Sequence, residues 1–335
     1  MSDRFRARLI AIGFLALVFV AAPAALTAFG KSYYWQVADL ALIFALLAGS
    51  MHLVTGVAGL LQLGHAAFYG VGAYAAALLA TKAGLSLAFT LPLAGLSAAT
   101  IAVLVALPTM RLVSIYFAVA TLAIGQMLYL IMLNWVEVTK GPNGIMLFSG
   151  MKFAGLDLSR PLPTYLVVAA TVCVSLFVLH RLSHSYYGNA LRALREDDQC
   201  ADAMGVDTVR LKIEAFGVSG FFAGVAGALW AHTAGFISPP DFSFQTSILI
   251  LAMVVVGGLG SLPGAVLGAF ILILLPEALR PFGDFRNIAV GVVLFASILF
   301  VPKGLIGEVS ALDFARRQLA GAWRRDGAGA EIGWR

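Results

Sequence analysis

Long apolar stretches separated by short polar segments run through almost the whole chain. A helix needs about 20 apolar residues to cross a bilayer. Stretches of roughly this length occupy 9–28, 37–56, 60–80, 87–107, 113–134, 163–181, 214–234 and 285–302. A longer stretch, 246–276, is interrupted by the glycine- and proline-rich run 257–264. The pattern predicts an all-α integral membrane protein whose longest polar connections are 135–162 and 182–213.

The composition excludes a soluble fold. Of the 335 residues, 61% are hydrophobic and 12% are charged, and the mean hydropathy is +0.93. Soluble domains carry about a quarter charged residues, because a surface that faces water needs polar groups. The net charge of +5 is not gathered into the long basic patch that nucleic-acid binding needs. The two cysteines, Cys173 and Cys200, indicate neither a disulfide framework nor a metal site.

The interrupted stretch 246–276 decides the number of spans. One helix there gives nine spans, whereas two segments that meet at the break give ten and place both termini on one side. Ten spans put roughly twice as many Lys and Arg residues on the cytoplasmic side as outside, in line with the positive-inside rule. We therefore predict about ten helices in a single membrane domain over 1–305. The tail 306–335 is then cytoplasmic, as is the N-terminus, and we expect its end to be disordered.

The N-terminal apolar stretch has two interpretations. It follows Arg4, Arg6 and Arg8 and ends in residues 21–25, which imitate a signal-peptidase site. Because the stretch is nearly long enough to span and many spans follow, a retained first span is simpler than a cleaved signal.

No pattern for ATP binding or catalysis is present in the sequence. The run Gly30-Lys31-Ser32 ends like a phosphate-binding loop, but Ala25 stands where that loop has its first glycine. The five histidines lack metal-ligand spacing, and paired carboxylates and a nucleophile elbow are missing. We expect a protein that is not an enzyme and binds no cofactor itself, so that ATP and Mg²⁺ belong to partner chains.

Polar side chains inside the predicted spans are candidates for a transport pathway, because burying them in lipid costs free energy. A hydrogen bond between helices is the alternative for each of them. Gly258, in the interrupted stretch, exposes backbone at membrane depth, which is tolerated where it is buried or lines a cavity. The candidate pathway residues are Gln62, His65, Thr121, Gln126, Asn134 and Gly258.

The connection 182–213 is the most charged segment of the chain. Its residues 189–204 are good helix formers without Pro or Gly, and Gly205 is placed to end the helix. The apolar stripe of this helix consists of Leu191, Leu194 and Ala201. An amphipathic helix between two spans is suited to dock into a groove of a soluble partner. The alternative is a helix on the membrane surface, which the acidic run 196–198 disfavours.

This segment resembles the EAA loop of ABC importer permeases, which forms the coupling helix that receives the ATPase. The exact triplet is absent, and the nearest matches are Glu196, Ala201, Ala203 and Gly205. On this resemblance, the residues that couple the chain to an ATPase are Leu191, Arg192, Arg195, Glu196, Asp197, Ala201 and Gly205.

Five ordered stretches resemble the branched-chain amino acid ABC permease family, specifically the longer of its two permease types. They are 59–74, 111–122, 139–144, 188–205 and 253–261. The resemblance implies a type II-like ABC importer fold in a bacterial inner membrane, and the segments 60–74 and 255–270 fit two pseudo-repeats. It also implies a heterodimer with the shorter permease, two cytoplasmic ATPase subunits and a periplasmic substrate-binding protein. That binding protein would contact Lys140 and Asn143 in the outer connection.

The cargo implied by the resemblance is Leu, Ile or Val, but relatives carry other amino acids, amides and urea. A permease for urea or short-chain amides therefore stays open. An ion-driven secondary transporter is a further alternative, which requires a carboxylate buried in mid-membrane, and the sequence presents no convincing one. A lipid-modifying membrane enzyme would need clustered His, Asp or Glu near one interface, which is missing.

Overall fold

The computed structural model describes residues 18–19, 23, 27, 32–110, 112, 114–147, 152–153, 156–157, 160–280, 291–292 and 295. The predicted spans 9–28 and 285–302 lie outside the described residues except at isolated positions. The predicted tail 306–335 and both termini lie wholly outside them.

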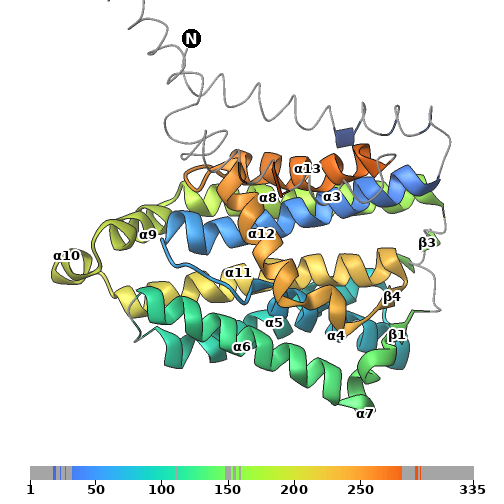
Figure 1. Ribbon diagram of the computed structural model, residues 1–335, viewed down its shortest axis with the longest axis horizontal. Helices are drawn as coiled ribbons and strands as arrows, with labels where there is room; N and C mark the ends of the chain where they lie inside the picture. Colours follow the sequence, from blue (N-terminus) through green and yellow to red (C-terminus); the bar gives the residue numbers. More distant parts are fainter. Residues whose placement is uncertain are drawn as a thin grey trace, which may run out of the picture.

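Long helices that run along a common axis make up the described part of the chain (Figure 1). They are α3 (Ser32–Met51), continued by the π-helix η2 (His52–Val57), α4 (His65–Ala83), α5 (Leu87–Thr109), α6 (Ser114–Asn134), α8 (Pro161–Ser183), α11 (Thr208–Ala234), α12 (Phe244–Gly257) and α13 (Leu262–Ala278). Six helical stretches among the described residues are long and apolar enough to cross a membrane. The prediction of an all-α membrane protein agrees with this architecture.

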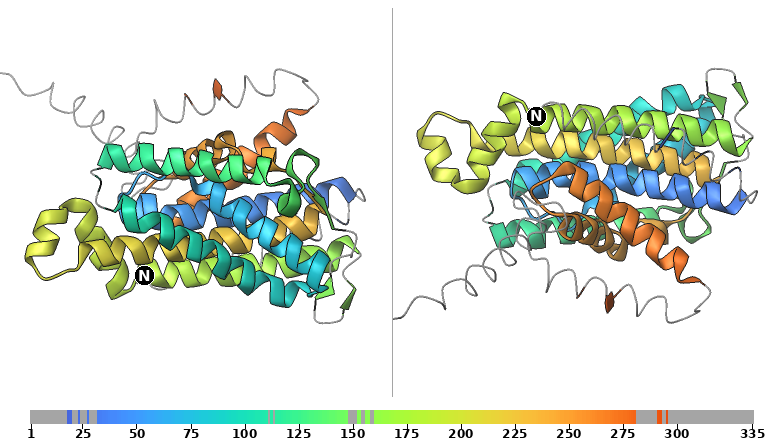
Figure 2. Two further views of the ribbon diagram at one scale, coloured as in Figure 1. Left: turned by 90° about the horizontal axis from the view of Figure 1, so that it is seen from below. Right: turned by 90° about the horizontal axis from the view of Figure 1, so that it is seen from above.

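Short elements occupy the two ends of the bundle. At one end lie α9 (Tyr186–Glu196) and α10 (Asp198–Ala203), which project beyond the long helices in both views of Figure 2. At the other end lie α7 (Val136–Thr139), η3 (Gly141–Asn143), β1 (Ile145–Met146), β4 (Phe236–Ile237) and η4 (Pro239–Phe242). The strand β1 pairs antiparallel with β4, and β2 (Lys152–Phe153) pairs antiparallel with β3 (Leu156–Asp157). The two long connections, 135–162 and 182–213, thus leave the bundle at opposite ends.

Helix α11 lies at the centre of the bundle and approaches α4 and α5 closely because its glycines carry no side chain. A Cβ atom on Gly72 of α4 would collide with the backbone of Gly224. A Cβ atom on Gly227 would lie 2.6 Å from the backbone nitrogen of Ala73. Small residues allow such backbone approach in lipid, where no hydrophobic force drives helices together. The glycines of this helix therefore serve packing.

The first helix break corrects the predicted span 60–80. The helix α4 begins only at His65, and the segment 58–64 before it is irregular. Two of its backbone N–H groups find acceptors inside the protein, since Leu60 donates to the carbonyl of Val54 at 3.0 Å and Leu63 donates to the hydroxyl of Thr121 at 3.2 Å. Backbone at membrane depth persists because the protein itself supplies these partners.

The second break confirms that the stretch 246–276 is not one helix. The helix α12 ends where Gly258 adopts φ +116°, a conformation that favours glycine. The next helix, α13, begins after Ser261, whose side chain accepts a hydrogen bond from the backbone of Gly264 at 3.2 Å. The two helices therefore form a pair joined by a tight turn.

The close approach of α4 and α11 predicts that Gly72→Val destabilises the fold. The added methyl groups would force the two backbones apart, and overpacking of this kind costs about 1–3 kcal/mol. We expect a lower thermal midpoint for the detergent-purified protein. The midpoint is the temperature at which half of the protein stays monodisperse after heating. The matched control is Gly217→Ala, because its Cβ would meet only a methyl group of Val103, at 2.9 Å. Equal midpoints for Gly72→Val and the wild type would contradict this account of the packing.

Candidate functional site

The segment between α8 and α11 forms an elbow, which we call the α9–α10 elbow (186–203). The prediction of one helix over 189–204 is wrong, because Asp197 adopts an extended conformation (φ −155°, ψ 113°) between α9 and α10. Its side chain caps α10 by accepting hydrogen bonds from the backbone of Gln199 and Cys200, both at 2.9 Å. Gly205 has φ +84° directly after α10, so its predicted role in ending the helix is confirmed.

The cap has an electrostatic consequence for both of its side chains. The backbone N–H of Cys200, together with its thiol, holds the pKa of the Asp197 carboxyl below its ordinary value. In turn, the hydrogen bond to Asp197 raises the pKa of the Cys200 thiol. Because folding lowers the pKa of Asp197, the cap contributes its full stability above the ordinary carboxyl pKa. This contribution is lost as the pH falls through the lowered pKa of the folded state.

The apolar stripe of the elbow faces the bundle. Leu191 is 0% exposed, and Leu194 and Ala201 are also buried. The expectation that this stripe enters a groove of a partner is therefore corrected, since the stripe holds the elbow on its own membrane helices. The apolar side chains that the elbow and its flank present outward are others, namely Tyr186 (94% exposed), Met204 (84% exposed) and Val209.

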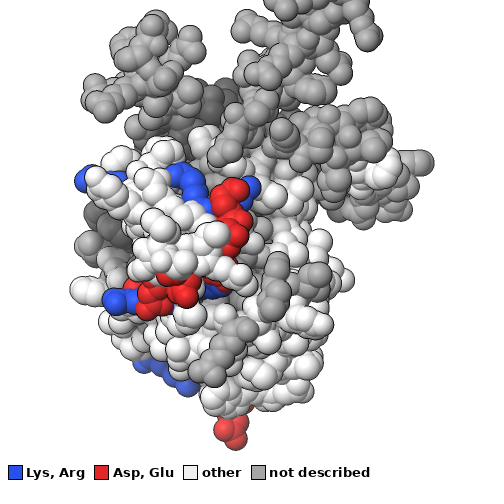
Figure 3. All heavy atoms as spheres, turned by 90° about the vertical axis from the view of Figure 1, so that its left-hand side faces the viewer, with Lys and Arg blue, Asp and Glu red and all other residues white. Residues whose placement is uncertain are grey.

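Carboxylates form a band on the outer side of the same end, as the space-filling view shows (Figure 3). The exposed acidic residues there are Glu196, Asp197, Asp198, Asp202 and Asp207. Asp198 pairs with Lys212, which ties α10 to the start of α11. The arginines Arg192 and Arg195 donate to backbone carbonyls of membrane helices. The outer surface of the elbow is thus acidic around exposed apolar side chains.

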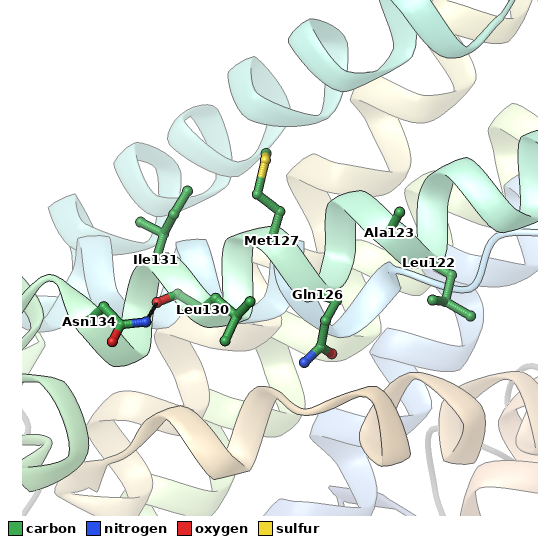
Figure 4. Close-up of a pocket in the computed structure, with 7 residues that line it drawn as sticks. All are labelled: Leu122, Ala123, Gln126, Met127, Leu130, Ile131 and Asn134. Atoms are coloured by element: carbon green, nitrogen blue, oxygen red, sulfur yellow. Dashed lines mark hydrogen bonds between the residues drawn. The ribbon is translucent and has the colours of Figure 1, made fainter.

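One face of α6 is exposed along the length of the helix. It bounds an open hollow of about 570 Å³ (Figure 4) lined by Leu122, Ala123, Gln126, Met127, Leu130, Ile131 and Asn134. Gln126 and Asn134 are exposed on this face, and the amide nitrogen of Asn134 donates to the carbonyl of Leu130 at 2.8 Å. Because amide groups are costly against lipid, this face is suited to another protein or a solute path.

The other predicted pathway residues are buried inside the chain. The imidazole Nε2 of His65 lies 2.9 Å from the hydroxyl of Ser50, and the carbonyl of Ser50 accepts from Ser219 at 2.8 Å, which joins α3, α4 and α11. Gln62 is buried, and its side-chain oxygen has no hydrogen-bond partner among the described residues. Thr121 accepts from the backbone of Leu63. His65 and Thr121 therefore hold neighbouring segments of the chain together, in line with the alternative interpretation, whereas the side-chain oxygen of Gln62 makes no such bond among the described residues.

A small cavity lies where α6 meets the start of α4 and the start of α12. Its volume is about 10 Å³, which is about the space of one water molecule. Its lining is Leu63, Gly64, Ala67, Leu122, Gly125, Gln126, Phe242, Phe244 and Ser247. Gly258 lies elsewhere, buried in the turn between α12 and α13. The predicted pathway residues do not line one continuous passage within the described part of the chain.

Lys140 and Asn143 are exposed at the end opposite the elbow. Lys140 has φ +61°, which is unusual for a residue with a side chain. The turn is held by Thr139, whose hydroxyl donates to the carbonyl of Met132 at 2.8 Å and accepts from the backbone of Gly141 at 3.2 Å. Both predicted contact residues are therefore presented outward on an ordered turn.

The sequence analysis missed a buried carboxylate in α3. Asp39 is 6% exposed, and its Oδ1 atom has no hydrogen-bond partner among the described residues. The signal was visible, since Asp39 lies inside the predicted apolar stretch 37–56. Among the described residues, no group of three or more His, Cys, Asp or Glu side chains could hold a metal ion.

Comparison with known proteins places this arrangement in a family. Residues 33–302 match the family described as "Branched-chain amino acid transport system / permease component". The permease protein LivM of the high-affinity branched-chain amino acid transport system of Escherichia coli K12 is 36% identical over 294 residues, which covers 81% of this chain and 69% of LivM. LivM of Salmonella typhimurium LT2 is equally similar.

More distant relatives include the permease protein BraD of the corresponding system of Pseudomonas aeruginosa, which is 27% identical over 286 residues, 79% of this chain and 92% of BraD. No solved structure matches this chain. The family match covers most of the chain, including the bundle helices, the α9–α10 elbow and the exposed face of α6. The chain therefore belongs to the family of permease components of branched-chain amino acid transport systems.

Proposed function

We propose that this chain is one of two membrane permeases of an ATP-driven ABC importer that carries branched-chain or related amino acids into the cytoplasm. The observation that carries the proposal is the α9–α10 elbow, in a chain that belongs to a permease family. The elbow is fastened to the membrane helices on one side and presents an acidic surface with exposed apolar side chains on the other. Such a surface is suited to receive a soluble subunit and pass its movement to the bundle.

The proposed topology has ten spans in a bacterial inner membrane, as in a type II-like importer. The eight long helices α3, α4, α5, α6, α8, α11, α12 and α13 and the predicted spans 9–28 and 285–302 add up to ten. An even number returns the chain to the side on which it began, so both termini lie with the elbow in the cytoplasm. The excess of Lys and Arg predicted on that side supports this orientation.

The second permease is proposed to lie against the exposed face of α6. Of the helical stretches suited to span a membrane, α6 has the smallest buried share within the described part of the chain. A second permease would cover its apolar residues, and the amides of Gln126 and Asn134 would line the path between the two chains. The match to shorter permeases such as BraD supports a heterodimer of two related permeases.

Energy is proposed to come from two cytoplasmic ATPase subunits that bind ATP and Mg²⁺. Each would dock on one permease, and here the contact would form around the exposed side chain of Met204 and the carboxylates of Glu196 and Asp197. At the other end, the turn with Lys140 and Asn143 would meet a periplasmic binding protein that delivers the substrate.

The assembly and cargo can be tested by purification of the protein after co-expression with its neighbouring genes. We expect a second permease and two ATPase subunits to co-purify, and Leu, Ile or Val with a binding protein to raise the rate of ATP hydrolysis. Stimulation by urea or a short-chain amide instead would change the cargo but keep the class. A chain that purifies alone and transports on an ion gradient would contradict the proposal. Asp39 would then be the candidate for the buried carboxylate that an ion-driven transporter requires.

The docking surface can be tested by alkylation of Cys200, which is exposed on α10. In a Cys173→Ala background, we expect labelling to slow when the ATPase subunits are bound, because they cover the elbow. In the chain alone, Asp197→Asn should speed labelling at pH 8, because it removes the carboxylate that raises the pKa of the thiol. Labelling of the assembled and isolated proteins at the same rate would place the ATPase elsewhere.

A substitution at Gly205 is expected to reduce transport while membrane insertion stays normal. Because Gly205 has φ +84°, a β-branched residue there is strained by roughly 1–2 kcal/mol and alters the end of α10. We expect Gly205→Val to reduce amino acid uptake several-fold at normal membrane abundance. Gly205→Asn is the matched control, since Asn tolerates this conformation better. Normal uptake by Gly205→Val at normal abundance would remove Gly205 from the coupling surface.

A further inference from the structure

The helix α9 lies across the ends of two membrane helices and binds both through arginines. Arg192 donates from Nη2 to the carbonyl of Ser183, the last residue of α8, at 2.8 Å. One turn later, Arg195 donates from Nη1 to the carbonyl of Gly56, near the end of η2, also at 2.8 Å. The last carbonyls of a helix lack partners within it, and the helix dipole favours a cation there. Each arginine thus satisfies the end of a different helix.

The aliphatic stem of Arg195 packs against the turn that follows η2. A Cβ atom on Gly59 would lie 2.7 Å from Cγ of Arg195, and Gly59 has φ +72°. The stem of Arg195 therefore fills space that only a glycine leaves open at this point of the turn. A shift of α9 would consequently carry the turn 56–59 with it.

Gly56 also contacts the second helix break. A Cβ atom on Gly56 would collide with the carbonyl oxygen of Leu259, in the turn between α12 and α13, and would lie 2.7 Å from Cε1 of His52. The contacts therefore run from Arg195 through Gly56 to Leu259. They join the elbow to the start of the first break and to the middle of the second.

The element between these contacts is a π-helix. Its backbone hydrogen bonds span five residues, a geometry that is rare and is frequent at functional sites. The helix α3 is regular up to Met51 and changes to this form over the six residues of η2, immediately before the irregular segment 58–64. A turn of this kind can absorb a displacement at its end with little change in the rest of α3.

We propose that Arg195 is a positioning residue that transmits movement of the α9–α10 elbow through Gly56 to the turn between α12 and α13, with η2 as the joint. Arg192 holds α9 on α8, so that the elbow pivots about that attachment. The inference rests on the proposed function, in which an ATPase moves the elbow. Its structural part, the hydrogen bond that joins Arg195 to Gly56 at η2, is independent of what moves the elbow.

The joint itself can be tested by hydrogen–deuterium exchange of the full chain in detergent. Arg195→Gln removes a charge-assisted hydrogen bond, and we expect exchange in residues 52–60 to become about tenfold faster. Arg195→Lys retains a cationic donor and should restore part of the protection. Arg210→Gln is the matched control, because Arg210 forms its ion pair with Glu214 of its own helix, at 2.9 Å. Unchanged exchange in Arg195→Gln would overturn the joint.

The transmission can be tested in the assembled transporter by the ratio of ATP hydrolysed to amino acid carried. We expect Arg195→Gln to assemble and hydrolyse ATP as the wild type does, while transport falls about tenfold, with part of the loss recovered in Arg195→Lys. Equal ratios in Arg195→Gln and the wild type would overturn the role, as would loss of ATPase binding, which makes Arg195 a docking residue. If the wild type bound no ATPase, the proposed function would be wrong. The hydrogen–deuterium exchange experiment would still test the contact between Arg195 and Gly56.

Discussion

Backbone that leaves the helical form within a membrane needs hydrogen-bond partners from the protein, and the arrangement of this chain depends on that constraint. Two interruptions, 58–64 and 258–261, occur in otherwise apolar segments. At the first, the hydroxyl of Thr121 on α6 accepts from the backbone of Leu63, and the hydroxyl of Ser247 on α12 accepts from Ala66 at 3.0 Å. Helices far apart in sequence are thereby held around the start of α4.

Close packing of helices makes these bonds available. The glycines of α4 and α11 bring the two backbones into contact, and the hydroxyl of Ser219 on α11 reaches the carbonyl of Ser50 on α3. Most of the polar side chains in this region therefore act within the chain. Among the described residues, Gln126 and Asn134 on the outer face of α6 carry exposed amide groups that are available to a partner or a solute. This division separates structural polar residues from candidate functional ones.

The side chains of the α9–α10 elbow divide in the same way between structural and exposed positions. Its leucines pack inward and two of its arginines satisfy helix ends, so the surface that remains is acidic and carries Met204 and Tyr186 outward. The elbow is bonded to η2 at the end of α3, to α8 and to α11. A displacement of the elbow would therefore also move helices that surround the two breaks.

The sequence by itself determined the class of the protein, because apolar length and the near absence of charge in the spans follow directly from the solvent. It also located the elbow and the break near Gly258, since acidic residues and a glycine-rich run interrupt apolar segments visibly. Only the tertiary structure decided that α4 begins at His65, that α9 and α10 are separate, and that Leu191 faces inward while Met204 faces outward. These outcomes depend on which neighbours offer a hydrogen-bond partner or an apolar surface, as Thr121 does for Leu63 and Gly56 does for Arg195. Gly56 and Arg195 are 139 residues apart in the chain, and Ala66 and Ser247 are 181 apart, so no local pattern contains these neighbours.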